Sequence, residues 1–290
     1  MRGALYSVSV DLDGLGCYAA IHGLPAQLDD RALRAVPEAA VQRFCELFAA
    51  LRIRATFFVI GREAGIAPQA LRNAAAFGHE MASHSFAHDY ALSRLPREAI
   101  AADLSAAERA IEESTGKRPR GFRAPGYTLS PALLEVVRER GYAYDSSLLP
   151  SPPYYLAKAA ALGAYALRRR RSESILGGMG QLFARRSAHR RAGVRELPVA
   201  TLPLLRAPVI GTSVLLFPRL ARAGFAGGHL NLELHGIDAL DGSDVPAAIA
   251  RAQPGVRMPA AQKLGRLRAL LQSLPGEACT LEQAALRLLP

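Results

Sequence analysis

Short runs of alternating apolar and polar residues are separated along this chain by longer amphipathic segments. Residues 6–11 (YSVSVD) and 229–235 (HLNLELH) alternate with the period of two that is typical of β-strands. Residues 37–52 place their large apolar side chains on one side of a helix, and residues 96–115 form a second helical pattern that ends before a glycine. Strand-like and helix-like segments therefore follow one another, and this order predicts an α/β fold.

Polar side chains that can take part in chemistry stand where the predicted strands end. In a barrel of parallel strands the carboxyl ends of all strands share one face, and active sites assemble there. The sequence therefore predicts a site on that face. The candidates are Asp11, Asp13, His84, Arg123, Asp145 and His235.

Four residues form a pattern that can bind a metal ion. His84 and His88 are four residues apart in ASHSFAHD, and Asp11 and Asp13 stand in VDLDG. Two imidazoles and one carboxylate can hold a divalent ion and leave positions open for water and substrate, and the second carboxylate can then act as a base. A histidine pair alone is a weak signal, because such pairs also share helix faces or cap turns. The combination outlines a hydrolase site.

The composition is that of a folded globular chain. Hydrophobic residues make up 50% of the 290 residues, and no linker rich in Pro, Gly or Ser divides them, so we predict a single domain over residues 1–290. The three cysteines are scattered and odd in number, which indicates neither a disulfide framework nor a cysteine metal site.

No segment of the sequence predicts export or membrane insertion. The residues before Asp11 are not typical of a signal peptide. The longest smoothly apolar stretch, residues 154–167, is too short to span a bilayer and contains Lys158. We therefore expect a cytoplasmic protein.

The positive charge is concentrated in one part of the chain. Residues 151–230 contain 13 Lys and Arg residues but only two acidic ones, so this segment accounts for the whole net charge of +11. Nucleic-acid binding is not expected, because the segment has no zinc-finger or helix-turn-helix pattern and no motif with interleaved aromatic residues. Two interpretations stay open: a surface that contacts anionic lipid or a phosphate-bearing substrate, and a solvated arginine-rich surface.

Several short motifs follow one another in a fixed order. VDLDG comes first, ATFFVIG and GHEMASHSFAH follow, and GFRAPGY, YAYDSSLLP and LELHG come later. From residue 10 to about residue 238 this order resembles the polysaccharide deacetylase family, the NodB-homology carbohydrate esterases. The match of GHEMASHSFAH to the metal-binding motif is specific, and VDLDG is similar to the Asp-x-Asp form of the first motif.

The resemblance implies a distorted (β/α) barrel with fewer than eight complete units. Residues 151–230 match the family pattern weakly, and we expect them to form a basic and apolar lid or substrate segment. The resemblance also implies a divalent metal ion, zinc or alternatively cobalt, nickel or iron, held by Asp13, His84 and His88. The implied activity is hydrolytic removal of an N-acyl group, acetyl or formyl, from an amino sugar. The metal ion would polarise the amide carbonyl and activate the bound water as nucleophile.

The resemblance also implies roles for the remaining candidates. Asp11 would be the general base, and Arg123 would orient it and keep it ionised, because a nearby cation favours the charged form. His235 would be the general acid that protonates the leaving amine, and Asp145 would orient His235.

The third and fourth motifs depart from the family pattern. Gly126 replaces the usual tyrosine and Tyr127 follows one place later, so a backbone N–H near these two residues would help to hold the oxyanion. The chain has no tryptophan, which commonly stacks on sugar rings, and a long glycan is therefore not the expected substrate. With the basic segment and the expected cytoplasmic location, this favours a lipid-linked or nucleotide-linked amino sugar at or near the inner membrane face.

Two other classes of protein are alternatives to this hypothesis. A non-catalytic sugar- or membrane-binding member of the same fold would not need the full set of polar residues. An iron oxygenase with two histidines and one carboxylate usually has a local His-x-Asp/Glu pair and a distant histidine, the reverse of the order here. Among the other polar residues, His79 is expected to be structural, His22 is a candidate for substrate contact, and Glu233 has no assigned role.

Overall fold

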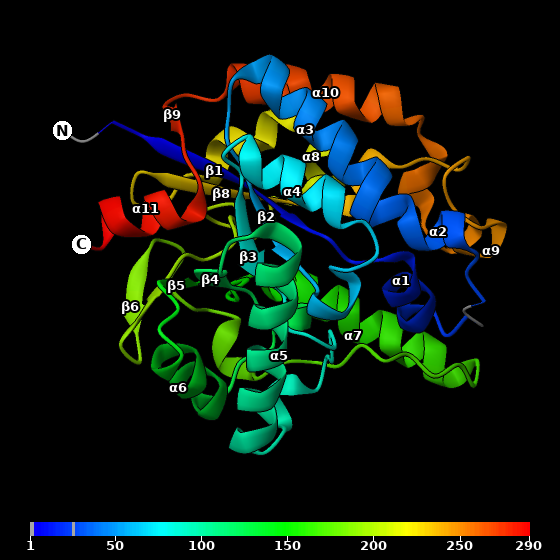
Figure 1. Cartoon of the computed structure of the whole chain (residues 1–290), viewed down its shortest axis with the longest axis horizontal. Helices are drawn as coiled ribbons and strands as arrows, with labels where there is room; N and C mark the ends of the chain where they lie inside the picture. Colours follow the sequence, from blue (N-terminus) through cyan, green and yellow to red (C-terminus); the bar gives the residue numbers. More distant parts are fainter. Residues whose placement is uncertain (1–2, 25–26) are drawn as a thin grey trace.

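A curled, mainly parallel sheet forms the centre of the molecule (Figure 1). The computed structural model describes residues 3–24 and 27–290, and residues 1–2 and 25–26 of the predicted domain lie outside this description. Within the described residues the strand order is β6-β7-β5-β4-β3-β2-β1-β8, and β9 pairs with β1. The strands are β1 (Leu5–Asp11), β2 (Thr56–Val59), β3 (Glu80–Ser83), β4 (Gly121–Phe122), β5 (Tyr144–Asp145), β6 (His189–Arg191), β7 (Val194–Glu196), β8 (His229–His235) and β9 (Glu277–Ala278).

Helices pack around this sheet. In the view of Figure 1, α3, α4 and α10 lie together on one side, α5 and α6 lie on the other, and α7 lies beside α1. The helices are α1 (Leu15–Ile21), α2 (Asp30–Arg34), α3 (Val41–Leu51), α4 (Pro68–Ala76), α5 (Arg97–Thr115), α6 (Pro131–Glu139), α7 (Pro152–Leu167), α8 (Gly211–Leu216), α9 (Ala247–Ala252), α10 (Ala260–Ser273) and α11 (Leu281–Leu288).

The helix ends follow from local chemistry. Helix α5 ends at Gly116, whose φ of 72° is left-handed and suits a residue without a side chain. The Ser130 side chain caps α6 by accepting from the N–H of Leu133. The helix predicted over residues 37–52 is a π-helical segment, η1 (Ala35–Ala40), followed by α3. Pro37 lies inside η1 and has no N–H for an α-helical hydrogen bond, which agrees with this break.

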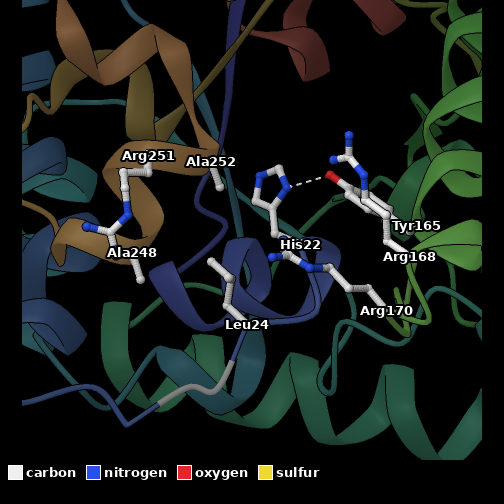
Figure 2. A pocket seen from close by; sticks show the side chains of 8 residues that line it. All are labelled: His22, Leu24, Tyr165, Arg168, Arg170, Ala248, Arg251 and Ala252. Atoms are coloured by element: carbon white, nitrogen blue, oxygen red, sulfur yellow. Dashed lines mark hydrogen bonds between the residues drawn. The ribbon is translucent and has the colours of Figure 1, made fainter.

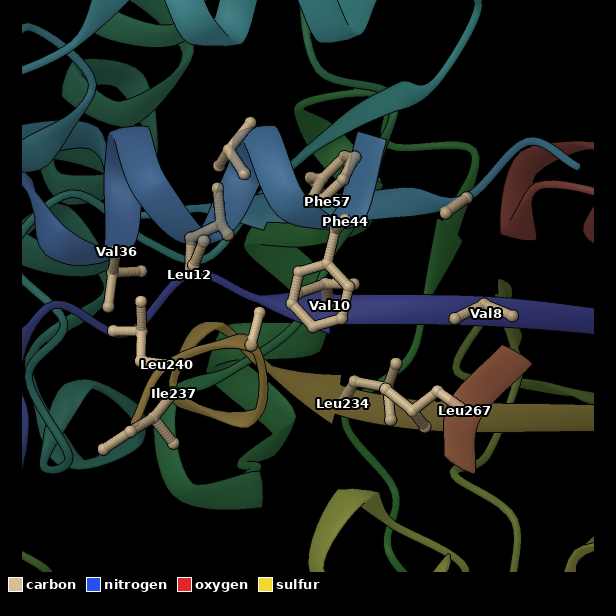
Figure 3. Packing of buried hydrophobic residues seen from close by; sticks show 14 of the residues in the cluster. Val8, Val10, Leu12, Val36, Phe44, Phe57, Leu234, Ile237, Leu240 and Leu267 are labelled. Atoms are coloured by element: carbon tan, nitrogen blue, oxygen red, sulfur yellow. The ribbon is translucent and has the colours of Figure 1, made fainter. Parts of the chain in front are cut away.

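The largest apolar core lies between the sheet and the helices on one of its sides. Val8 and Val10 of β1 and Leu234 of β8 project toward Phe44 of α3 and Leu267 of α10 (Figure 3). All five side chains are at most 1% exposed. Burial of a side chain of this size stabilises the fold by roughly 1.5–3 kcal/mol, so this core fixes the positions of β1 and β8.

The opposite side chains of β1 point into the barrel, because successive side chains of a strand alternate. Ser9 donates to the Asn231 side chain on β8 (3.0 Å) and accepts from Arg123 (3.1 Å). Asn231 in turn donates to Ser146 Oγ (3.0 Å), and its carbonyl accepts from the N–H of Ala200 (3.0 Å). The chain after β7 therefore reaches β8 and closes the curl, which confirms the predicted distorted (β/α) barrel.

The predicted lid segment, residues 151–230, differs from the rest of the surface. Among the described residues, twelve large hydrophobic side chains are exposed, and nine of them belong to this segment. Helix α7 opens the segment with two prolines in its first turn and the Ser151 side chain as its cap. Across the described chain, helices with the length and apolar character to cross a membrane are absent.

Candidate active site

Asp13, His84 and His88 converge at the carboxyl end of the sheet. Asp13 follows β1, His84 follows β3, and all three side chains are buried. Asp13 Oδ1 lies 3.4 Å from His84 Nε2 and 3.3 Å from His88 Nε2. The chain between the two histidines is a tight turn with left-handed backbone at Ser85 and His88. The four-residue spacing is therefore a turn that directs both rings to one carboxylate.

The three side chains fit a divalent metal ion. The Nδ1–H of His84 donates to the backbone carbonyl of Arg123 (2.8 Å), which leaves the Nε2 lone pair facing Asp13. Asp13 Oδ1 and His88 Nε2 are buried without hydrogen-bond partners, an arrangement that costs about 1–3 kcal/mol for each group. A cation at their centre would satisfy all three atoms, and two nitrogens with one oxygen are a common set for zinc and related ions.

Arg123 links the second carboxylate to the barrel interior. Its Nη1 donates to Asp11 Oδ1 at 2.5 Å, its Nε donates to the carbonyl of Ser146 at 2.9 Å, and the guanidinium is fully buried. Burial alone would raise the pKa of Asp11, but Arg123, His84 and His235 lower it below its ordinary value. The structure thus brings together the predicted base and the residue predicted to orient it.

His235, at the end of β8, lies beside Glu233. The His235 Nε2 is 4.0 Å from Glu233 Oε1, which also accepts from the hydroxyl of Tyr127 at 2.6 Å. Burial would lower the pKa of His235, but the charges of Glu233, Asp13 and Asp11 raise it to about 9. A histidine with this pKa is protonated near neutral pH and can donate a proton.

The structure corrects the role predicted for Asp145. Ser146 points into the barrel, so the side chain of Asp145 points to the other face of β5. There it accepts from the hydroxyl of Ser147 (2.5 Å) and pairs in register with Glu196 of β7. Burial raises the pKa of both carboxyl groups, and each lies beside the other. Asp145 therefore belongs to a buried acid pair outside the barrel, and Glu233 stands next to His235 instead.

The oxyanion prediction is also refined. The N–H of Tyr127 donates to the carbonyl of Ala124 at 3.2 Å inside the turn η4 (Pro125–Tyr127), so it is engaged, and Gly126 is the better candidate of the two. Gly126 has a φ of 62°, and a Cβ there would come within 2.7 Å of the Tyr90 ring. The close approach of Tyr90 explains why the family tyrosine is a glycine in this chain.

A pocket of about 340 Å³ is lined by Asp11, Asp13, His84, Gly126, Tyr127 and His235, among others. The lid segment contributes part of its wall, with Tyr154 and Lys158 of α7 one helical turn apart. Burial lowers the pKa of Lys158 to about 8, and its Nζ donates to the carbonyl of Gly126 at 3.4 Å. The sequence alone does not predict Lys158 as a site residue and indicates no role for Glu233. One available signal for Lys158 is that it is a lone lysine in an apolar stretch. The signal for Glu233 is its two-residue spacing from His235, which places both side chains on one face of a strand.

Two other histidines that the sequence singled out, His79 and His22, lie outside this pocket. His79 accepts from the N–H of Ala55 at 3.1 Å and packs against Phe48 and Phe57. These contacts agree with the structural role expected for His79. His22 lines a second pocket next to the first (Figure 2).

Comparisons with known sequences agree with these motifs. Residues 29–144 match the family profile described as polysaccharide deacetylase. A peptidoglycan deacetylase of Helicobacter pylori is 28% identical over 156 residues, which cover 52% of this chain and 53% of the relative. A chitooligosaccharide deacetylase of Azorhizobium caulinodans is 34% identical over 98 residues, covering 33% and 46%. The matched region thus spans about half, or less, of these relatives' own length.

Solved structures share the fold over nearly the whole chain. A Mycobacterium smegmatis protein described as a polysaccharide deacetylase has a TM-score of 0.66 at 19% identity, covering 99% of this chain and 90% of its own. BA3943 of Bacillus anthracis, described as a CE4 family pseudoenzyme, has a TM-score of 0.52 at 9% identity, covering 98% and 66%. At these identities the likeness establishes the fold alone.

The fold defines a protein of the distorted (β/α)-barrel class, and the motifs at its strand ends follow the order found in the sequence. The profile match over residues 29–144, the deacetylase relatives and the shared fold together support assignment to the polysaccharide deacetylase family.

Proposed function

We propose that this protein is a metal-dependent de-N-acylase that removes an acetyl or formyl group from an amino sugar. The observation that supports this most strongly is the cluster of Asp13, His84 and His88, which leaves buried ligand atoms unpartnered in the same pocket as Asp11 and His235. The deacetylase relatives support de-N-acetylation as the reaction class.

Each side chain of the pocket has a role in this proposal. When bound, a divalent ion supplies Lewis-acid polarisation of the acyl carbonyl and lowers the pKa of water. Asp11, kept ionised by Arg123, accepts the proton of the attacking water. His235, whose pKa is raised to about 9, protonates the leaving amine. The N–H of Gly126 stabilises the oxyanion.

The substrate proposal rests on the lid segment. We propose one catalytic domain in which residues 151–230 select an amino sugar linked to a lipid or a nucleotide. Tyr154, Lys158 and Gly211 bring this segment to the pocket wall. Its exposed apolar side chains and its excess of arginine favour peripheral contact with an anionic membrane surface, and in this proposal the protein acts in the cytoplasm.

The decisive experiment measures bound metal and acyl release on the same samples. Wild type, His88→Ala and the control His189→Ala are purified without chelator, analysed by plasma mass spectrometry, and assayed for acetate and formate release from N-acetyl- and N-formylglucosamine. His189 lies on β6, outside the pocket, so its variant should keep the metal and the activity. His88→Ala should lose both. Asp11→Asn should keep the metal and lose turnover by a factor of about 10² to 10⁴.

Two results would contradict the proposal. A folded wild type that takes up neither zinc nor cobalt would exclude the metal site. Bound metal without acyl release from any amino sugar would place the chain with non-catalytic members of the same fold.

A further inference from the structure

A second pocket of about 410 Å³ lies beside the active-site pocket, and we call it the His22 pocket. Its polar lining consists of His22, Tyr165, Arg168, Arg170 and Arg251, and its other lining residues are apolar. Arg168 and Arg170 approach from the end of α7, whereas Arg251 belongs to α9 across the opening (Figure 2). None of the described residues that line it is acidic.

The three guanidinium groups of the His22 pocket lack the partners that other arginines have. Arg43, for example, forms a two-pronged ion pair with Asp244. Within the described chain, Arg168, Arg170 and Arg251 make no side-chain hydrogen bond or ion pair. Three uncompensated cations around one cavity produce a positive potential there, and guanidinium groups match the oxygens of phosphate in both charge and shape.

His22 contributes a neutral imidazole to this pocket. Its Nδ1 lies 2.7 Å from the hydroxyl of Tyr165, and its Nε2 is buried without a hydrogen-bond partner. Burial, and secondarily the charge of Arg170, lowers the pKa of His22, so the ring is neutral near pH 7. If the Tyr165 hydroxyl donates to Nδ1, the proton of the ring is on Nε2, where it has no acceptor inside the protein. An oxyanion in the pocket would be that acceptor.

The same elements line both pockets. On α1, Tyr18 lines the active-site pocket and His22 follows one helical turn later. On α7, Lys158 lines the active-site pocket and Tyr165 the His22 pocket. Tyr165 follows Lys158 by seven positions, which corresponds to a helical rise of about 10 Å. The chain after α7 continues past Arg168 and Arg170 to Ser174, which lines the active-site pocket. A ligand about 10 Å long can therefore contact both.

We propose that the His22 pocket binds a phosphate group of the substrate while the acylated nitrogen lies at the Asp13 cluster. This inference rests on the proposed function and narrows the substrate class to phosphorylated amino sugars. The phosphate belongs either to a soluble sugar phosphate or nucleotide sugar, or to the link between the sugar and a lipid. Both sources present the same oxygens to the arginines.

Binding of a defined probe tests the subsite separately from catalysis. The metal-loaded Asp11→Asn protein, which should not turn over, is titrated calorimetrically with N-acetylglucosamine 1-phosphate and with neutral N-acetylglucosamine. The variant Arg168→Ala/Arg170→Ala is compared with Arg72→Ala/Arg268→Ala, which removes two exposed arginines from α4 and α10 and changes the net charge equally. The first pair should weaken binding of the phosphorylated sugar about tenfold or more and leave the neutral sugar unchanged. The control pair should change neither.

Further results separate the possible outcomes. An equal loss in both pairs, or no loss in either, would overturn the subsite. Arginine-dependent binding without any acyl release by the wild type would contradict the proposed function and leave the subsite standing. Acyl release by the wild type, with binding that does not depend on Arg168 and Arg170, would contradict the subsite and leave the proposed function standing. The source of the phosphate is identified by comparing two ligands. One is N-acetylglucosamine 1-phosphate in solution, and the other is the same headgroup on a polyprenyl chain in phosphatidylcholine vesicles. The ligand that binds more tightly indicates the source.

Discussion

The barrel interior and the segment of residues 151–230 use charge in opposite ways. In the interior, Arg123 is fully buried and its donors are shared between Asp11, Ser9 and Ser146. In the segment, Arg168 and Arg170 are exposed, and their side chains have no hydrogen-bond or ion-pair partner among the described residues. A buried charge tolerates only one geometry, whereas an exposed charge is free to meet a ligand. The difference assigns the chemistry to the interior and recognition of the substrate to the segment.

The same contrast applies to apolar side chains. Those of β1 and β8 are buried between the sheet and its helices, whereas Leu204 and Leu205 of the segment are 94% and 75% exposed. Exposed apolar groups contribute nothing to the core, and a cluster of them marks a contact surface. Substitutions should therefore have large effects on stability and turnover in the interior, and effects mainly on binding in the segment.

Arg123→Lys should have the largest effect. A lysine ammonium cannot replace the planar group that contacts Asp11 and Ser146 together, so Asp11 loses its orientation and a buried partner is left unsatisfied. We expect turnover to fall by a factor of about 10² or more and the free energy of unfolding to fall by about 3–5 kcal/mol. Urea denaturation and acyl-release kinetics measure the two effects.

The matched control is Arg97→Lys on the surface, where the exposed Arg97 pairs with Glu139. It should change neither quantity, since exposed ion pairs contribute little. Equal effects of the two substitutions would remove the distinction between interior and surface charge.

Glu233→Gln should have an intermediate effect that is visible in the pH profile. Glu233 is the first of the charges that raise the pKa of His235, against the opposite effect of burial. Without it the pKa of His235 falls, so the acid form is lost at a lower pH and the alkaline limb of the turnover profile moves toward neutral pH. We expect turnover at pH 8 to fall about tenfold. Glu196→Gln, in the acid pair outside the barrel, should leave the profile in place. An unmoved alkaline limb in Glu233→Gln would show that Glu233 does not act through His235.

Much of the interior could be predicted from sequence because strand ends are local features. Asp11 and His235 end recognisable strands, Asp13 and His84 follow closely after such strands, and parallel strands bring these ends to one face. The prediction that Asp145 orients His235 is wrong, because the role of Asp145 depends on which face of a two-residue strand its side chain occupies. Neighbouring strands decide that, and the local sequence does not.

The His22 pocket could not be predicted for a different reason. Its polar residues come from α1, the end of α7 and α9, which are far apart in sequence and meet only through tertiary packing. The charge of residues 151–230 was visible in the sequence, but the same composition also describes a solvated surface. Only the position of the arginines around a cavity beside the active site distinguishes the two.

Leu204→Ser/Leu205→Ser should have the smallest effect on the folded chain and a clear effect on membrane contact. Both side chains are exposed, so the free energy of unfolding should change by less than about 0.5 kcal/mol. If the segment contacts a membrane, the two leucines enter the interface, and their loss should weaken binding to phosphatidylglycerol vesicles about tenfold at low salt.

The control for this last prediction is Phe77→Ser/Leu286→Ser, which alters exposed apolar residues outside the segment and should leave vesicle binding unchanged. Co-sedimentation at two salt concentrations separates the apolar contribution, which persists, from the arginine contribution, which salt screens. A wild type that ignores anionic vesicles even at low salt would exclude membrane contact. The arginines of the segment would then act through the His22 pocket on a soluble phosphorylated sugar, and the contrast between interior and segment would become one between catalysis and substrate choice alone.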